Sequence, residues 1–150
     1  MKKILLILSL FLFSYKNAYG LITVDITRGN LDPLPIAVSP LHVDPKSEKL
    51  SIFETVKLGG EISKIVERNF KSTGLFNPLK KDAFVQKPDI AHLKPRFEDW
   101  RLIKAQALVT GKLLVKDGKL KVEFRLWDLT AAKEMTALAF TTTPSNWRRV

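Results

Sequence analysis

The chain has 150 residues, 45% of them apolar, and a formal net charge of +10 at neutral pH. This is the length of one domain with enough apolar residues for a core, which excludes intrinsic disorder and collagen-like repeats. There are no cysteines and only two histidines, His42 and His92. Disulfide scaffolds, thiolate metal sites, iron–sulfur clusters and thiol nucleophiles are therefore excluded, and a histidine-rich metal site is not expected.

Residues 1–20 have the features of a secretory signal peptide. Two lysines follow the first methionine, and residues 4–13 are apolar except for one serine. That run is shorter than the roughly 20 residues needed to span a bilayer. Ala18 and Gly20 place small residues at the −3 and −1 positions, so we expect cleavage between Gly20 and Leu21. An uncleaved anchor is the alternative, and lipoprotein processing is excluded because it needs a cysteine.

Two extended segments follow. Residues 21–27 alternate apolar and polar side chains, which is typical of a strand with one buried face. Such a strand at a mature N-terminus could offer its edge to a partner or pair within its own sheet. Residues 35–41, within an extended stretch over 33–44, predict a second strand, which its flanking prolines confine to a short or edge position.

Two helices are predicted next. Residues 61–72 carry apolar side chains at helical spacing, and Gly74 suits a C-cap. Gly59 and Gly60 are interpreted as a loop, because no phosphate-binding glycine motif accompanies them. The second helix is predicted over 95–105, opened by a proline. Its face of Phe97, Trp100 and Ile103 is expected to lie in the core.

The last third predicts a three-stranded antiparallel meander with one apolar and one polar face. Its strands are expected at 107–115, 120–126 and 134–142, with an Asp-Gly hairpin turn between the first two. Trp127 falls on the polar side of the alternation and is expected to pack at a strand end under a loop, with an exposed contact residue as the alternative. Residues 145–150 predict an N-cap and one helical turn, which cannot stand alone in water. We therefore expect a fragment or a truncated gene product.

Together these elements predict the α/β (α+β) fold class: a mixed β-sheet with a C-terminal three-stranded antiparallel meander packed by two helices. The expected organisation is a signal peptide at 1–20 and one domain at 21–150. Cleavage would lower the net charge to +7, with basic residues scattered rather than gathered in a run.

No constellation for catalysis is found. The sequence contains no nucleophile elbow and no zinc-protease motif. Acidic residues occur in two groups, one formed by Asp44, Glu48 and Glu54 and the other by Glu98 and Asp99, and are interpreted as solvated. The two histidines are expected to be exposed or satisfied in the core. We expect no enzyme activity, no cofactor and no metal.

Several segments in a fixed order resemble the TolB family, the periplasmic component of the Tol-Pal envelope system. They are residues 22–29, 35–40, 67–79 and 107–111, with Trp100 eleven residues ahead of Gly111. The resemblance covers the N-terminal α/β domain. TolB proteins continue through a further helix into a six-bladed propeller that contacts the lipoprotein Pal. The resemblance reaches only the N-terminal domain, and we expect the propeller to be missing, so the resemblance implies a Pal contact only where a propeller is present. The charged loop at 45–50 departs from a glycine-rich family tendency.

The resemblance implies a non-enzymatic periplasmic protein that contacts the inner-membrane protein TolA and supports envelope integrity and constriction at division. No nucleic-acid partner is expected, and the protein would be peripheral to the envelope membranes. The residues implied in the TolA contact are Leu21, Ile22, Thr23, Val24, Asp25, Ile26, Thr27 and Arg28. A free terminal strand can add to a partner's sheet edge through backbone hydrogen bonds. The alternative is an exported domain that binds nucleic acid or another anionic polymer through the basic meander.

Overall fold

The computed structural model describes residues 32–48 and 52–149. The signal peptide expected at 1–20, the cleavage point between Gly20 and Leu21, and the strand expected at 21–27 lie outside these residues. The described elements, in chain order, are β1 (Leu34–Val38), β2 (His42–Val43), α2 (Ile52–Ser72), β3 (Phe76–Pro78), the 3-10 turn η1 (Lys81–Ala83), α3 (Pro88–Ala91), α4 (Phe97–Leu102), β4 (Ala107–Lys116), β5 (Lys119–Asp128), β6 (Lys133–Thr142) and the 3-10 turn η2 (Pro144–Arg149).

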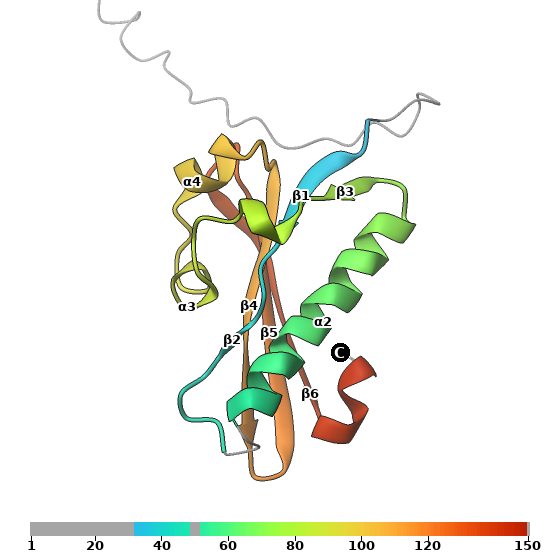
Figure 1. Ribbon diagram of the computed structural model, residues 1–150, viewed down its shortest axis with the longest axis vertical. Coiled ribbons are helices and arrows are strands. Elements are labelled where there is room, and N and C mark those ends of the chain that lie inside the picture. The colour runs from blue at the N-terminus through green and yellow to red at the C-terminus, as the bar shows by residue number, and fades with distance from the viewer. Residues whose placement is uncertain (1–31, 49–51, 150) are drawn as a thin grey trace, which may run out of the picture.

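The strands form one mixed sheet in the order β3-β1-β4-β5-β6, with β2 also paired to β4. β1 is parallel to both neighbours, with Leu34 opposite Phe76 and Ile36 opposite Ala107. β4, β5 and β6 form the antiparallel meander (Figure 1). The expected fold class, a mixed sheet that ends in a meander and packs against helices, is confirmed.

Because successive side chains of a strand point to opposite faces of the sheet, the buried residues form a core on each face. On one face, Ile36, Val38 and Val109 pack with the apolar side of α2. On the other face, Ala37 and Leu108 pack with residues of α3, α4 and their loops, including Trp100, Phe97 and Phe84. The meander was expected to have one wet face. Near Trp127 this expectation is wrong, because the α3–α4 segment covers that end of the second face.

Helix α2 begins at Ile52, so the predicted start at 61 and the predicted Gly59–Gly60 loop are wrong. The reason is tertiary packing, which overrides the low helix propensity of glycine. A Cβ on Gly59 would lie 2.9 Å from the Leu41 carbonyl oxygen, so the glycine allows the helix to approach the chain closely. The predicted C-terminal end at Ser72 is confirmed, and Gly74 has the expected positive φ of 72°.

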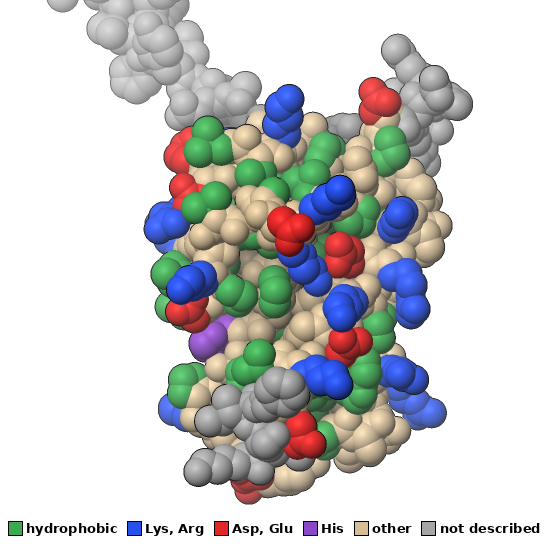
Figure 2. Space-filling model, viewed as in Figure 1, with side chains coloured by type: hydrophobic (Ala, Val, Ile, Leu, Met, Phe, Trp, Pro, Cys, Tyr) green, Lys and Arg blue, Asp and Glu red, His purple; other side chains and the backbone are tan. Residues whose placement is uncertain are grey.

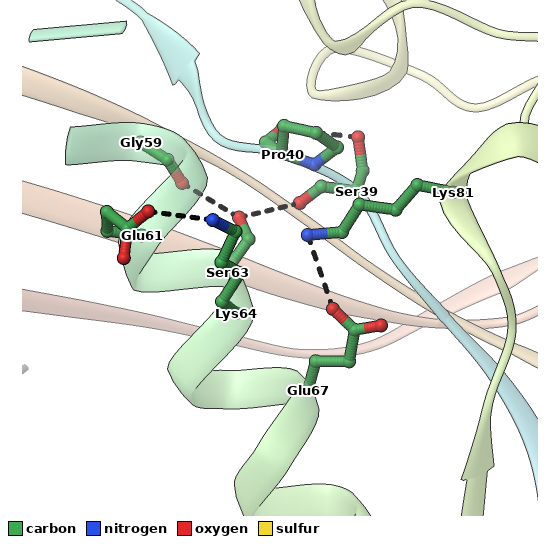
Figure 3. Close-up of polar contacts among 8 residues, drawn as sticks. All are labelled: Ser39, Pro40, Gly59, Glu61, Ser63, Lys64, Glu67 and Lys81. Atoms are coloured by element: carbon green, nitrogen blue, oxygen red, sulfur yellow. Dashed lines mark hydrogen bonds and ion pairs between the residues drawn. The ribbon is translucent and has the colours of Figure 1, made fainter. Parts of the chain in front are cut away.

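The contact between α2 and the β1–β2 junction is also polar (Figure 3). The buried Ser63 hydroxyl lies 2.9 Å from the Gly59 carbonyl oxygen and 3.1 Å from the Ser39 carbonyl oxygen. Ser39 directly precedes Pro40, where β1 pairing ends, so its carbonyl needs a partner outside the ladder. Further along the helix, the Glu67 carboxylate pairs with Lys81 at 3.2 Å. These contacts fix the helix against the strand break.

The strand predicted at 35–41 is divided into β1 and β2, which are both short, as the flanking prolines predict, although β1 lies in the interior of the sheet rather than at an edge. Pro35 lies at the very start of the β4 pairing. Its carbonyl oxygen accepts the Gln106 N–H at 2.9 Å, and ladder pairing with β4 begins only at Ile36. The missing proline N–H therefore falls where it interrupts no ladder hydrogen bond.

The helix predicted over 95–105 is shorter than expected, because α4 ends at Leu102. Lys104 has φ 61°, and the Ala105 N–H bonds to the Trp100 carbonyl oxygen at 3.2 Å, which closes the helix before β4. The expected core face is confirmed: Trp100 is 1% exposed, and Phe97 and Ile103 pack beside it.

The meander agrees closely with its prediction. Asp117 and Gly118 both have positive φ, as a two-residue hairpin turn requires. Trp127 is buried as expected, and its Nε1–H donates to the Thr110 hydroxyl at 2.8 Å. The predicted C-terminal turn is present as η2, where Trp147 packs on the core beside α2.

Candidate functional site

The partner-binding residues expected at 21–28 lie outside the described residues. The structure describes the place where the following chain joins the sheet. Leu34 donates its N–H to the Leu75 carbonyl oxygen at 2.9 Å, and β1 is enclosed between β3 and β4. In the described sheet, the two-residue β2 is paired on one side only, and the two ends of the strand order are formed by the edges of β3 and β6.

These two edges differ greatly in length and chemistry. β3 pairs over three residues, whereas β6 has ten and carries no charged side chain from Met135 to its end at Thr142. A long uncharged edge presents unpaired N–H and C=O groups to another polypeptide. Charged residues on β6 are confined to its start, where Glu134 accepts a hydrogen bond from Arg125 at 2.7 Å.

An apolar groove of about 290 Å³ lies between α2 and β6. It exists because α2 lies nearest to β1, β2 and β3, which leaves part of the same sheet face uncovered toward β6. Leu138 and Phe140 on β6 are 56% and 39% exposed as a result. The groove lining consists of Val66, Phe70, Val109, Phe124, Arg125, Leu126, Thr136, Leu138 and Phe140.

Three basic side chains on the polar face of the meander, Lys112, Lys121 and Arg125, are paired with carboxylates. Glu123 lies 2.7 Å from the Lys121 ammonium and 3.6 Å from that of Lys112, which also lies 3.9 Å from Asp44. The hydrogen bond from Lys121 holds the pKa of Glu123 below its usual value. Figure 2 shows blue and red side chains interspersed over the face that it displays. This distribution differs from the continuous basic stripe typical of a nucleic-acid interface.

Four of the five acidic residues discussed as catalytic candidates make contacts typical of a structural role. Asp44 accepts the Lys46 N–H, and Glu48 accepts the Asp117 N–H, each at 2.9 Å. Glu98 and Asp99 form ion pairs with arginines within their own helical turn. Across residues 32–48 and 52–149, no three His, Asp or Glu side chains are placed to hold a metal ion. In the same part of the chain, no helix has the length and apolar character to cross a membrane.

His42 and His92 are brought together, which the sequence analysis did not foresee. Their rings stack with centroids 4.1 Å apart and planes 6° from parallel. His42 belongs to β2, and His92 directly follows α3. The two residues are distant in sequence, so no local pattern signals the contact.

Fold and surface together define a small mixed α/β domain whose accessible features are a long strand edge and an apolar groove. The family model of the TolB amino-terminal domain matches residues 22–135 of the chain. The chain therefore belongs to the TolB amino-terminal domain family, as its sequence resemblance indicates.

A known relative agrees with this assignment, and two solved structures share the fold. The chain is 64% identical over 143 residues to the Tol-Pal system protein TolB of Pelagibacter ubique (strain HTCC1062), covering 94% of this chain and 32% of that protein. The chain thus spans about a third of the length of this curated relative. The crystal structure of TolB from Acinetobacter baumannii is similar with a TM-score of 0.56 at 17% identity, over 77% of this chain and 25% of that one. The LpoB C-terminal domain from Escherichia coli has a TM-score of 0.54 at 10% identity, over 77% and 87% of the two chains. At these identities the two structures show a shared fold alone.

Proposed function

We propose that this chain is a non-enzymatic, exported component of a Tol-Pal assembly in the periplasm. It contacts a TolA-like inner-membrane protein through residues 21–28, and so supports outer-membrane integrity and envelope constriction during division. The observation that carries this proposal is the 64% identity to a Tol-Pal system protein. The family match begins at residue 22 and so includes almost all of the proposed contact segment. A Pal contact belongs to the proposal only where a propeller is joined to this domain.

The chemistry of the segment supports a strand-addition contact. Ile22, Val24 and Ile26 alternate with polar residues, so one side of an extended strand would be apolar. Backbone hydrogen bonds to a partner's sheet edge would supply affinity, and the alternate side chains would supply specificity. The segment precedes β1, which already has a strand on both sides. Binding through residues 21–28 therefore requires no described strand to be displaced.

The test is a calorimetric titration of residues 21–150 with the C-terminal domain of TolA, in moderate and in high salt. We expect binding that tolerates salt and that disappears when residues 21–28 are deleted, while the circular dichroism of the domain is unchanged. Substituting Ile22 and Ile26 by serine should weaken binding by the loss of apolar contacts. The matched control substitutes Thr23 and Thr27 by serine on the opposite side of the strand.

Unchanged affinity after the deletion would refute the contact through residues 21–28. A steep loss of binding as salt is added would instead favour the alternative, a domain that binds an anionic polymer. Binding to phosphates releases counterions and is therefore strongly salt-dependent. No binding by a protein shown to be folded would refute the TolA contact itself.

A further inference from the structure

The stacked histidines connect β2 with α3, two elements that are far apart in the sequence. The contact lies on the sheet face that α3 and α4 cover. His42 lies on β2, in register with Lys112 of β4. His92 is the C-cap residue of α3, and the Ala91 side chain beside it is fully buried in the core. The two rings lie almost parallel with centroids 4.1 Å apart. Neutral imidazoles can stack in this way, whereas two imidazolium ions at this distance repel each other.

The hydrogen bond of His92 defines where it takes up a proton. Its Nδ1 lies 3.1 Å from the Pro88 carbonyl oxygen, which can only accept, so Nδ1 carries the hydrogen. Nε2 is then the atom that is protonated when the ring becomes charged. The Pro88 contact persists in both states and keeps His92 fixed to the turn of α3.

Charged groups of both signs surround the pair. Asp89 of α3 and Asp44 after β2 favour a charged His42, whereas Lys112 of β4 opposes it. Lys112 is itself paired with Asp44 and Glu123. Glu123 and Arg125 of β5 line a small cavity of about 100 Å³ together with His92, and Arg125 is bound to Glu134 of β6. Burial and His92 together outweigh the two aspartates and lower the pKa of His42 from its usual 6.5.

The α3 segment has few other attachments to the sheet. It is a four-residue helix without a side-chain cap at its start, and Ala91 is its one buried residue. Ile90 and Leu93 on either side of Ala91 and His92 are 47% and 72% exposed. Segments with so few buried apolar contacts open locally at low free-energy cost. A repulsive contact at His42 therefore acts on a short element with one buried residue.

We propose that His42 and His92 form a pH-sensitive contact, which holds the α3 segment on the sheet while the imidazoles are neutral and releases it when they are protonated. Acidification would thus open this face of the domain locally while β4 and β5 remain folded. The proposal is independent of the contact through residues 21–28.

Proton NMR of the full chain tests the proposal directly. Because the sequence contains only two histidines, their imidazole Cε1–H signals give two titration curves, assigned with His42→Gln and His92→Gln. We expect His42 to titrate below pH 6.5 and its midpoint to move upward in His92→Gln. The proposal is overturned if the His42 midpoint lies at or above 6.5 and does not respond to His92→Gln.

Amide exchange measures the opening itself. The N–H groups of Ala91, His92 and Leu93 all donate to backbone carbonyls of this turn, and their protection factors should fall between pH 7.5 and 5. For each unit by which the pKa of His42 differs between the closed and the open segment, the equilibrium constant for opening changes about tenfold. Protection of Leu113 and Val122 in the sheet should stay constant over the same range.

His42→Phe provides a second variant that retains an aromatic ring against His92 but does not ionise. We expect its α3 protection to be independent of pH, while the wild type loses protection on acidification. Equal loss of protection in His42→Phe and the wild type would refute a role of His42 protonation.

Discussion

Gly59 and Gly60 are adjacent in α2 but meet different surroundings. A Cβ on Gly59 would lie 2.9 Å from the Leu41 carbonyl oxygen and 3.2 Å from the Leu113 side chain, whereas a Cβ on Gly60 would have no neighbour within 4 Å. Gly59 therefore serves close packing, and Gly60 lowers helix stability without an observed packing benefit. The pair shows how one residue type has two physical roles within a single helical turn.

The same substitution at the two positions should change stability in opposite directions. Gly59→Ala is expected to destabilise the domain by about 1–3 kcal/mol, because the helix must move away from backbone at Leu41. Gly60→Ala is expected to stabilise it by about 0.5–1 kcal/mol through higher helix propensity. Urea denaturation of the two variants and the wild type measures both free energies of unfolding. Equal effects of the two substitutions would contradict the close approach of α2 at Gly59.

Residue-scale prediction from the sequence succeeded where the cause was local. The Asp117–Gly118 turn follows from the backbone conformations that hairpins require, and both residues have positive φ. The His42–His92 contact has no local cause, because it depends on how β2 and α3 meet across the sheet. Likewise, the acceptor of the Trp127 indole N–H is Thr110 on the neighbouring strand, which the strand pattern alone does not identify.

At the scale of elements, the meander was predicted well because alternation and turn chemistry are encoded within each strand. The start of α2 and both ends of α4 differ from their predictions, whereas the predicted end of α2 at Ser72 is confirmed. α2 extends ahead of its glycines because contacts with Leu41 and Ser39 hold that part of the helix. The interior position of β1 also depends on β3, whose three-residue pairing is too short to be recognised from sequence periodicity.

The apolar groove between α2 and β6 should be detectable with an apolar fluorescent dye. Leu138 lies opposite Phe124 on the groove side of β6, whereas its neighbour Ala139 points to the other face. Leu138→Lys is expected to reduce dye fluorescence several-fold, because it places a charge in the groove. Since Leu138 is 56% exposed, its free energy of unfolding should change by less than about 1 kcal/mol.

Ala139→Lys is the matched control for the groove. It introduces the same charge on the same strand, but on the opposite face, and should leave dye fluorescence close to that of the wild type. Equal fluorescence loss in both variants would show that the dye responds to overall charge rather than to the groove.

At the scale of the whole molecule, the excess of basic residues does not produce one continuous basic surface. Lys112, Lys121 and Arg125 of the meander each have a carboxylate partner within 4 Å. The net charge of +10 therefore acts mainly on solubility and long-range attraction, which salt screens. The pH dependence of stability, in contrast, is set by the few groups whose pKa values change on folding.

Two such groups predict a stability that falls in two steps on acidification. His42 has a folded pKa below its usual 6.5, because burial and His92 disfavour its charged form. Below about pH 6.5 the unfolded chain therefore binds more protons than the folded chain does. The contribution of His42 to the free energy of unfolding is complete above about pH 6.5 and is lost as the pH falls through the folded pKa. Glu123 has a folded pKa below its usual 4.5, because of the hydrogen bond from Lys121. Its contribution is complete above about pH 4.5 and is lost as the pH falls further.

Urea denaturation at a series of pH values separates the two steps by substitution. His42→Gln should flatten the decline that begins near pH 6.5 and leave the acidic step unchanged. Glu123→Gln should do the reverse, with a lower stability at neutral pH because its ion pairs with Lys121 and Lys112 are lost. Each pKa unit between the folded and unfolded states corresponds to about 1.4 kcal/mol, reduced here by the partial exposure of both side chains. A wild-type stability that stays constant between pH 7.5 and 5.5 would contradict the step assigned to His42. His42 and Glu123 both interact with Lys112. The loss of unfolding free energy in the double variant should therefore be smaller than the sum of the two single losses.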